Sequence, residues 1–479
     1  MSGPTSGGPA EGVERTAIPG LLVVPLAVHR DDRGWFKENW HRQRMTAQGL
    51  PDFGPVQHNL AFNVRRGVTR GIHAEPWDKL VSVATGRVFG AWVDLREGAT
   101  FGTVVHRELD PGSAVFVPRG VGNAYQALED QTSYSYLVND HWVAGQDYPM
   151  VNPGDAAVGV PWPIPLDEAE LSAKDLAAPG LEQVTRFPSG PRVVVLGAGG
   201  QLGRALTAAF PGARAVTRAE LDVSDADAVA AWSWSDHDVV LNAAAYTAVD
   251  AAETPEGRPA AWAANAVAPA LLARQALDHR LTVVHYSTDY VFDGAPSGPA
   301  GYREDAPVAP LGVYGQSKAA GELALTALPS HFVLRTSWVV GDGANFVRTM
   351  AALAARGASP AVVADQVGRL TFATELARAT RHLLDRRAAY GTYHVTGAGP
   401  EQSWLDVARQ VFELCGRAGD DVAATSTEEY GRGKALAPRP TRSTMDLTRI
   451  HDTGFVSGDP DDLLSRYVAG LRSNHPQED

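Results

Sequence analysis

The sequence predicts a multidomain protein, with an N-terminal all-β sandwich or barrel and a C-terminal α/β domain built on a doubly wound parallel sheet. The chain has 479 residues, more than the ~100–200 typical of one domain. Residues 18–162 contain short runs of alternating apolar and polar residues separated by Gly, Pro, Asn and Asp, which is typical of antiparallel strands. From Pro191 onward, apolar runs alternate with alanine-rich helical stretches, which is typical of a parallel sheet.

In the first half, four runs each predict a strand. They are KLVSVATG (79–86), RVFGAWVDLREG (87–98), TVVHREL (103–109) and SAVFVPRG (113–120). A segment rich in proline and acidic residues, VPWPIPLDEAELSAKDLAAPG, follows and closes the domain. We place the β domain at 13–176 and a linker at 177–190. The preceding residues 1–12 are rich in Gly, Pro and Ser, and we expect them to form a disordered tail.

In the second half, the apolar run RVVVLGAGG ends in glycines and is followed by the helical stretch QLGRALTAAF. Further buried strands are predicted at DVVLNAAA, LTVVHYSTDYVF and HFVLRTSWVV. These elements define a second domain over 191–479, whose last part we expect to form a small substrate subdomain.

Composition excludes several classes of protein. The formal net charge is −13, from 55 acidic and 42 basic side chains, so a nucleic acid or an anionic membrane is not an expected partner. A single cysteine, Cys415, allows no internal disulfide and no thiolate metal cluster, which fits a reducing cytoplasm. No run approaches the ~18 apolar residues of a membrane span, and the N-terminus does not resemble a signal peptide.

A glycine-rich turn follows the first strand of the second domain. Gly197, Gly200 and Gly203 enclose Gln201 and Leu202 at the predicted start of a helix. Glycines there let a pyrophosphate approach the helix N-terminus, so we expect a dinucleotide site rather than only a tight strand–helix turn.

Two residues beyond this turn bear on the choice of cofactor. Asp222 lies about 20 residues further on, where it could contact the adenosine, or it could merely flank a helix cap. Arg218 could accept a 2′-phosphate, which favours NADP(H) over NADH, or it could be an exposed loop arginine.

A hydroxyl and amine cluster predicts carbonyl reduction. Tyr314 and Lys318 are four residues apart, so they share one face of a helix, and we expect the ammonium to lower the pKa of the phenol. Such a tyrosine can protonate a carbonyl oxygen as hydride arrives. Ser287 and Thr288, at the end of an apolar strand, could join the site. The order of these motifs is that of short-chain dehydrogenases with a Rossmann fold.

Longer motifs give a closer resemblance. NAAAYTAVDAAE, HYSTDYVFDG, VYGQSKAAGE, LRTSWVV, DQVGRLT and RPTRSTMD resemble dTDP-4-dehydrorhamnose reductases. The resemblance implies a catalytic triad of Thr288, Tyr314 and Lys318. It also implies cofactor contacts at Ala243, Ala244, Tyr246 and Asn265, and sugar-nucleotide contacts at Trp338, Asn345, Arg439 and Ser443. One departure is Leu370, where the family has proline. Some relatives hold magnesium through glutamates that do not map onto this chain, so we predict no metal.

In the first half, His73 and Lys79 suggest proton abstraction beside a ketone, with the lysine stabilising the enolate. A structural histidine is the alternative reading. A metal site would need a second histidine two residues away, which His73 lacks.

Longer motifs favour a catalytic role for His73 over a structural one. DDRGWFKENW, VQHNLAF, GVTRGIH, VFVPRGVGNAY and LSAKD resemble dTDP-4-dehydrorhamnose 3,5-epimerases, which implies a cupin-like jelly roll. By that resemblance His73 and Asp175 form the basic dyad, Tyr136 reprotonates the opposite face and Lys79 contacts the C4 oxygen. Nucleotide contacts would be Arg33, Glu38, Gln57, Asn59 and Arg70. Asn123 and Leu137 depart from the family, and the loop before Lys79 is short.

The two resemblances name consecutive steps of one pathway. We therefore expect a cytoplasmic, homodimeric enzyme that converts dTDP-4-dehydro-6-deoxy-D-glucose to dTDP-L-rhamnose with NADPH. One alternative is a single-centre epimerase and ketoreductase acting on another deoxysugar nucleotide. The other is a non-catalytic, reductase-like binding subunit.

Overall fold

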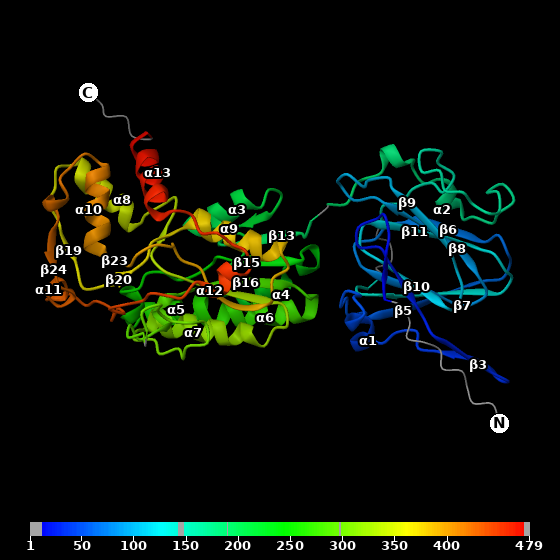
Figure 1. The fold of residues 1–479 in the computed structure, drawn as a ribbon, viewed down its shortest axis with the longest axis horizontal. Coiled ribbons are helices and arrows are strands. Elements are labelled where there is room, and N and C mark those ends of the chain that lie inside the picture. Colours follow the sequence, from blue (N-terminus) through cyan, green and yellow to red (C-terminus); the bar gives the residue numbers. More distant parts are fainter. Residues whose placement is uncertain (1–11, 142–147, 189, 297, 474–479) are drawn as a thin grey trace. The chain divides into compact units, whose positions relative to one another are not determined.

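The computed structural model describes residues 12–141, 148–188, 190–296 and 298–473 (Figure 1). The chain divides into two compact units, residues 1–190 and 191–479. The tail predicted over residues 1–12 lies, apart from Gly12, outside the described residues.

The N-terminal unit is the expected jelly roll, with two antiparallel sheets. The larger sheet has the order β1 (Glu14–Arg15), β2 (Leu22–Pro25), β10 (Ser113–Val117), β7 (Lys79–Thr85), β12 (Thr132–Val138) and β5 (Gln57–Asn63). The smaller sheet has the order β6 (Thr69–His73), β11 (Val121–Ala127), β8 (Val88–Asp94) and β9 (Val104–Leu109). The four strands predicted from alternation are β7 to β10. Their inward residues, among them Val81, Trp92 and Val115, form the core between the sheets.

Short elements complete this unit. They are the hairpin β3 (Val28–Asp31) and β4 (Gly34–Lys37), the helices α1 (Arg42–Ala47) and α2 (Ala173–Leu176), and a 3-10 turn at Leu181–Gln183. Part of the predicted linker packs on the jelly roll. Leu181 and Val184 are buried in one of its clusters, and the Phe187 backbone N–H donates to the Leu95 carbonyl at 2.9 Å. The unit thus continues past residue 176, because these apolar side chains cover the smaller sheet.

The C-terminal unit contains one parallel sheet. Its order is β14 (Arg214–Val216), β13 (Val193–Leu196), β15 (Val239–Asn242), β16 (Thr282–Thr288), β17 (His331–Thr336) and β22 (Gly391–His394). The chain starts at β13 and winds in both directions, so a crevice forms beyond the carboxyl ends of β13 and β15, where α/β sheets bind ligands.

Helices cover both faces of this sheet (Figure 1). On one face lie α3 (Gln201–Ala209) and α9 (Ala373–Asp385). On the other lie α4 (Ala226–Ala231), α6 (Ala268–His279) and α7 (Val313–Thr326). The helix α5 (Gly257–Trp262) leads through a π-helical turn at Ala263–Val267 into α6. No helix in the described ranges is both long and apolar enough to cross a bilayer.

A smaller subdomain follows, with its own apolar cluster. Its helices are α8 (Phe346–Ala355), α10 (Trp404–Leu414), α11 (Thr427–Gly431) and α13 (Pro460–Ser473), whereas α12 (Thr448–Asp452) packs on the parallel sheet through Ile450. Its short strand pairs are β18 (Val339–Val340) with β21 (Thr371–Phe372), β19 (Ala361–Val363) with β24 (Ala423–Thr425), and β20 (Val367–Gly368) with β23 (Gln402–Ser403). Leu370, where a proline was expected, is buried in the same cluster, so the loop that contains it is held by packing.

A buried ion pair fixes α7 to the sheet. The Arg335 guanidinium on β17 donates to both Glu322 oxygens on α7, from Nε at 3.0 and 3.1 Å and from Nη2 at 2.7 Å. The two side chains are only 7% and 6% exposed. Removing one partner of such a pair leaves a buried charge without compensation.

We predict that Arg335→Met destabilises the C-terminal unit by about 3–5 kcal/mol, because the Glu322 carboxylate stays buried without its partner. Urea unfolding of the full chain, followed by tryptophan fluorescence, measures the change. Arg466→Met is the matched control, since Arg466 pairs with Asp462 on the exposed face of α13. Its effect should stay within about 0.5 kcal/mol. Equal effects of the two variants would contradict the prediction.

Candidate active sites

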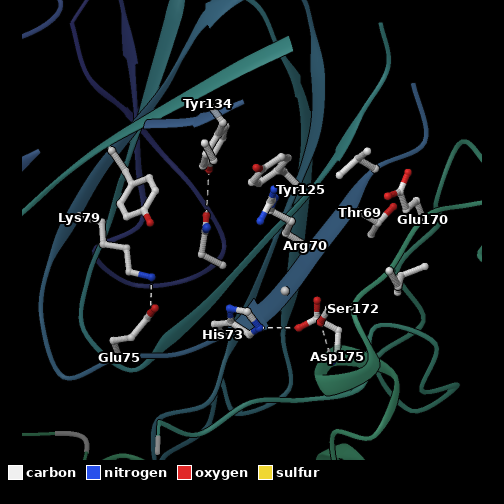
Figure 2. Close-up of a pocket in the computed structure, with 16 residues that line it drawn as sticks. Thr69, Arg70, His73, Glu75, Lys79, Tyr125, Tyr134, Glu170, Ser172 and Asp175 are labelled. Atoms are coloured by element: carbon white, nitrogen blue, oxygen red, sulfur yellow. Dashed lines mark hydrogen bonds and ion pairs between the residues drawn. The ribbon is translucent and has the colours of Figure 1, made fainter. Parts of the chain in front are cut away.

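A cavity of about 410 Å³ opens inside the jelly roll. Its wall is formed by strands of both sheets and by the segment that leads into α2 (Figure 2). Five residues predicted from the sequence line it: Arg70, His73, Lys79, Tyr136 and Asp175. The fold therefore brings together Arg70 and Asp175, which are 105 positions apart in the sequence.

His73 and Asp175 form a hydrogen-bonded pair. His73 ends β6, and its Nε2 lies 2.6 Å from Asp175 Oδ1 (Figure 2). Ser172 caps α2 by accepting from the Asp175 backbone N–H at 3.1 Å, which fixes the carboxylate. Burial alone would raise the pKa of Asp175, but hydrogen bonds from His73, Ser172 and Gly71 lower it. An ionised carboxylate orients the imidazole and stabilises its protonated form, as a general base requires.

Lys79 begins β7 and is 4% exposed. Its ammonium pairs with the Glu75 carboxylate on the same cavity wall (Figure 2). Sequence reasoning did not identify Glu75. The signal available was an acid four positions before the lysine in HAEPWDK. The pair neutralises a buried charge while leaving N–H groups for a developing oxyanion.

The third proton-handling group is Tyr136. Burial foremost, and the negative charge of Glu75 next, raise the pKa of Tyr136, while Arg70 opposes them. The phenol therefore keeps its proton and can act as a donor. Asn123, where the family has histidine, accepts from Tyr134 Oη at 3.1 Å and from Trp92 Nε1 at 2.9 Å. Its role here is to hold the aromatic wall.

Four predicted nucleotide contacts do not line this cavity. Arg33 bonds Asp31 on the exposed β3–β4 hairpin, and Glu38 pairs with Arg44. Gln57 donates to Asn59 at 2.8 Å, and both lie on the inward face of β5, in line with Ala61 of the cavity wall. Arg33 and Glu38 lie outside the lining of this cavity, and the nucleotide contacts predicted for all four residues stay predictions.

A second cavity, of about 520 Å³, lies at the crevice of the parallel sheet. It is lined by residues from the glycine turn, from the ends of β15 and β16, from α7 and from the small subdomain. The predicted residues among them are Gly200, Gln201, Leu202, Ala243, Thr288, Tyr314, Lys318, Trp338 and Asn345.

The glycine turn fits a dinucleotide. Gly197 has φ +73°, which favours glycine. A Cβ on Gly203 would lie 2.1 Å from the Gly197 carbonyl oxygen, so only glycine lets α3 approach the turn. No side chain caps the N-terminus of α3 at Gly200, so its backbone N–H groups can receive a pyrophosphate.

Neither Asn265 nor Tyr246 lines the second cavity, and the cofactor contacts predicted for them stay predictions. Asn265 is fully buried and brackets the Tyr246 backbone: Oδ1 accepts from the N–H at 2.9 Å, and Nδ2 donates to the C=O at 3.0 Å. Ala244 packs beside Gly197. The residues of this loop that line the cavity are Ala243, Ala245, Thr247 and Val249.

Arg218 and Asp222 bond each other at 3.0 Å, and Arg218 is 84% exposed. Asp222 also accepts from the Ser224 backbone and hydroxyl. Asp222 thus shapes the turn before α4, and neither residue lines the cavity. This is the flanking alternative that the sequence left open for Asp222.

Tyr314 and Lys318 lie on one face of α7, beside Thr288. The expected lowering of the phenol pKa is wrong for this structure: burial raises the pKa of Tyr314 to about 12, and its hydrogen bond with Thr288 only partly opposes this. Burial lowers the pKa of Lys318 to about 8, although Glu322 acts in the opposite direction. A protonated tyrosine is the form that donates to a carbonyl oxygen.

Asp289 is a cavity residue that sequence reasoning missed. It follows Thr288, accepts its hydroxyl at 3.0 Å, and is 2% exposed. Burial raises the pKa of Asp289 to about 6, and hydrogen bonds from Ser443 and Thr288 restrain the rise. Ser443 therefore reaches the site through Asp289. The acid in the motif STDYVFDG was the available signal.

A third cavity, of about 820 Å³, shares Tyr290, Phe346 and Trp404 with the second. Arg439 lines it and pairs with Asp250 at 2.8 Å. Trp338 stacks on Trp404 with 3.7 Å between ring centroids, at the boundary of the two cavities. Across the described residues, no group of three or more His, Cys, Asp or Glu side chains could hold a metal ion.

Comparison with known proteins covers both units. Residues 191–469 match the RmlD substrate binding domain family, and residues 15–183 match the dTDP-4-dehydrorhamnose 3,5-epimerase family. The second unit is 39% identical over 279 residues to a dTDP-4-dehydrorhamnose reductase of Aggregatibacter actinomycetemcomitans, covering 54% of this chain and 92% of that protein. The first is 48% identical over 174 residues to a protein RmlC homolog of Streptococcus pyogenes serotype M6, covering 35% of this chain and 87% of that protein.

A solved structure is similar to the C-terminal unit. The dTDP-4-dehydrorhamnose reductase of Bacillus anthracis, in complex with NADP, has a TM-score of 0.53 and 32% identity, covering 58% of this chain and 98% of that one. The chain therefore belongs to the RmlD family over its C-terminal unit and to the dTDP-4-dehydrorhamnose 3,5-epimerase family over its N-terminal unit.

Proposed function

We propose that the chain is a bifunctional enzyme of dTDP-L-rhamnose biosynthesis. It epimerises dTDP-4-dehydro-6-deoxy-D-glucose at C3 and C5 and then reduces the C4 ketone with NADPH. The observation that carries this proposal is that one chain holds two cavities lined by groups suited to proton transfer: His73 with Asp175 in the jelly roll, and Tyr314 with Thr288 and Lys318 in the sheet domain. The single cysteine supports a reducing, cytoplasmic location.

In the first site, His73 takes the proton from a carbon next to the ketone, and the C–H electron pair moves into an enolate. Lys79 donates to the enolate oxygen, while Asp175 holds the imidazole and stabilises its positive charge. Tyr136 returns a proton to the opposite face of the carbon, which inverts the centre. Exchange of both groups with water then restores the starting protonation states.

In the second site, NADPH supplies the hydride when bound beside the glycine turn. Tyr314 gives its proton to the C4 oxygen, which becomes the product hydroxyl. The Thr288 hydroxyl bonds Tyr314 and positions it, and the Lys318 ammonium stabilises the phenolate that remains. A proton from solvent then restores Tyr314.

The nucleotide part of the substrate would use the polar and aromatic groups around the cavities. Arg70 and Arg439 suit a diphosphate, because the guanidinium fork binds phosphate oxygens in pairs. Trp338 and Asn345 would lie at the sugar, with Ser443 acting through Asp289. Arg218 would contact the 2′-phosphate of NADPH by leaving Asp222, which its high exposure allows.

We also propose a homodimer formed through the jelly roll. β5 is an edge strand of the larger sheet, and its outward residues Leu60 and Phe62 are 66% and 57% exposed, while Val64, directly after the strand, is 64% exposed. An exposed apolar edge of this length favours pairing with another chain. The β3–β4 hairpin extends from the same unit (Figure 1) and would bring Arg33 and Glu38 to a second copy.

The first test supplies the full chain with dTDP-4-dehydro-6-deoxy-D-glucose and NADPH in D₂O. We expect dTDP-L-rhamnose with deuterium at both C3 and C5, because each inverted carbon takes its new proton from solvent through Tyr136. NMR of the product gives both the stereochemistry and the label positions. Label at one carbon only would support the single-centre epimerase instead, and absence of NADPH oxidation would support the binding subunit.

Two variants should separate the activities. His73→Asn should lower deuterium exchange about 10²–10⁴-fold, because the base is lost, while reduction of pre-epimerised ketone continues. Tyr314→Phe should do the reverse and lower NADPH oxidation by a similar factor. Each variant is the control for the other, with exchange followed by NMR and oxidation by absorbance. A variant that abolished both activities would refute two independent sites.

The dimer is tested with Leu60→Lys combined with Phe62→Lys. Two charges on the β5 edge should convert a dimer to a monomer in sedimentation velocity, because pairing would bury them. The control is Val456→Lys, since Val456 is 74% exposed in the C-terminal unit. A dimer that persists in the double variant would place the interface elsewhere.

A further inference from the structure

A histidine lies buried behind the lysine of the second site. His285 on β16 is fully buried, and its Nε2 is 3.3 Å from Lys318 Nζ. Lys318 Nζ also donates to the Tyr286 carbonyl at 2.5 Å. On the other side of the ring, the Asn242 side chain lies 3.1 Å from His285 Nδ1. Asn242, at the end of β15, lines the same cavity as Lys318.

The chemistry of these contacts fixes the histidine tautomer. An ammonium group only donates, so Nε2 must accept and the ring proton must lie on Nδ1. Nδ1–H then needs an acceptor. Among the described residues, Asn242 Oδ1 is buried and has no hydrogen-bond partner when its Nδ2 faces the ring. Turning the amide by 180° places Oδ1 against Nδ1–H and satisfies both groups, since oxygen and nitrogen of an amide are assigned by their hydrogen bonds.

We propose that His285, held as the Nδ1–H tautomer by Asn242, is a positioning residue that keeps Lys318 protonated and holds its ammonium at the wall of the cavity that Tyr314 also lines. The proposal rests on the proposed reduction and goes beyond it, because His285 touches neither substrate nor cofactor. Two of the three Lys318 N–H groups are bonded to the Tyr286 carbonyl and to His285. The third is left for another partner, and Lys318 lines the cavity.

The charged and titratable groups around Lys318 do not replace its contact with His285. Glu322, one turn further along α7, is held by Arg335 of β17 through three bonds. Asp289, after β16, faces Thr288 and Ser443. Tyr314 on α7 and Tyr286 on β16 are kept protonated by burial, which raises the pKa of each. The neutral imidazole is therefore the side-chain acceptor that directly contacts the ammonium.

The pH dependence follows from the direction of these shifts. Burial, and the positive charge of Lys318, lower the pKa of His285 well below its ordinary value, so the ring stays neutral. Burial lowers the pKa of Lys318 to about 8. An acceptor stabilises the charged form of the amine, so its removal should lower the pKa of Lys318 further. The ammonium would then be lost at a lower pH, and reduction with it.

The experiment measures the pH profile of ketone reduction, with pre-epimerised substrate and NADPH, for the wild type, His285→Leu and His285→Gln. We expect the basic limb of kcat to move down by about one pH unit in His285→Leu, since a hydrogen bond to a charged group is worth roughly this much. His285→Gln offers a carbonyl acceptor and should restore the limb to within a few tenths of a unit. His331→Leu is the control, because His331 is a buried histidine that contacts the Leu328 carbonyl.

A second readout needs no turnover. ¹⁵N NMR of the histidine-labelled wild type should show a neutral Nδ1–H imidazole, and this signal should be missing in His285→Gln. The tautomer measurement does not use His285→Leu, so it tests the proposal even if that variant does not fold. An Nε2–H tautomer, or equal basic limbs for the wild type and His285→Leu, would overturn the proposal. If the wild type does not reduce the ketone, the proposed function fails while the tautomer is still measured.

Discussion

Burying a lysine ammonium is the constraint on which both sites depend. Lys79 and Lys318 are 4% and 2% exposed, and a charge so far from water is stable only when it is paired or hydrogen-bonded. The two units meet this need differently. Lys79 has a carboxylate partner in Glu75, whereas Lys318 contacts a carbonyl oxygen and a neutral imidazole. Burial lowers the pKa of Lys318 to about 8, and the Glu322 carboxylate one turn away acts in the opposite direction.

The same environment keeps the tyrosines protonated. Burial raises the pKa of Tyr136 and Tyr314, and a nearby carboxylate, Glu75 or Asp289, adds to the rise. Each phenol is therefore a proton donor paired with a lysine that faces the same cavity. An oxyanion at C4 develops in both proposed reactions, as an enolate in one and an alkoxide in the other. One arrangement of lysine and tyrosine on two unrelated folds thus suits the same carbonyl group.

Sequence reasoning predicted the elements well where the local pattern is strong. Alternation located β7 to β10, and the glycine turn located α3. The pairing of His73 with Asp175 came from resemblance, because residues 102 positions apart carry no local signal. Glu75 and His285 were missed because their roles depend on burial against a lysine. The hydrogen bonds from the Asn265 amide to the Tyr246 backbone were not predicted, because a sequence does not reveal that an amide turns inward.

The chemistry fixes the order of the two proposed reactions. Protons at C3 and C5 are acidic only while C4 is a ketone, since the enolate needs that oxygen. Reduction removes the carbonyl and with it the acidity, so the stereochemistry that we propose His73 and Tyr136 set can no longer change. An isomerisation that need not favour its product is thereby drawn forward by hydride transfer. Because both proposed sites lie on one chain, the reductase and the epimerase are present in equal numbers.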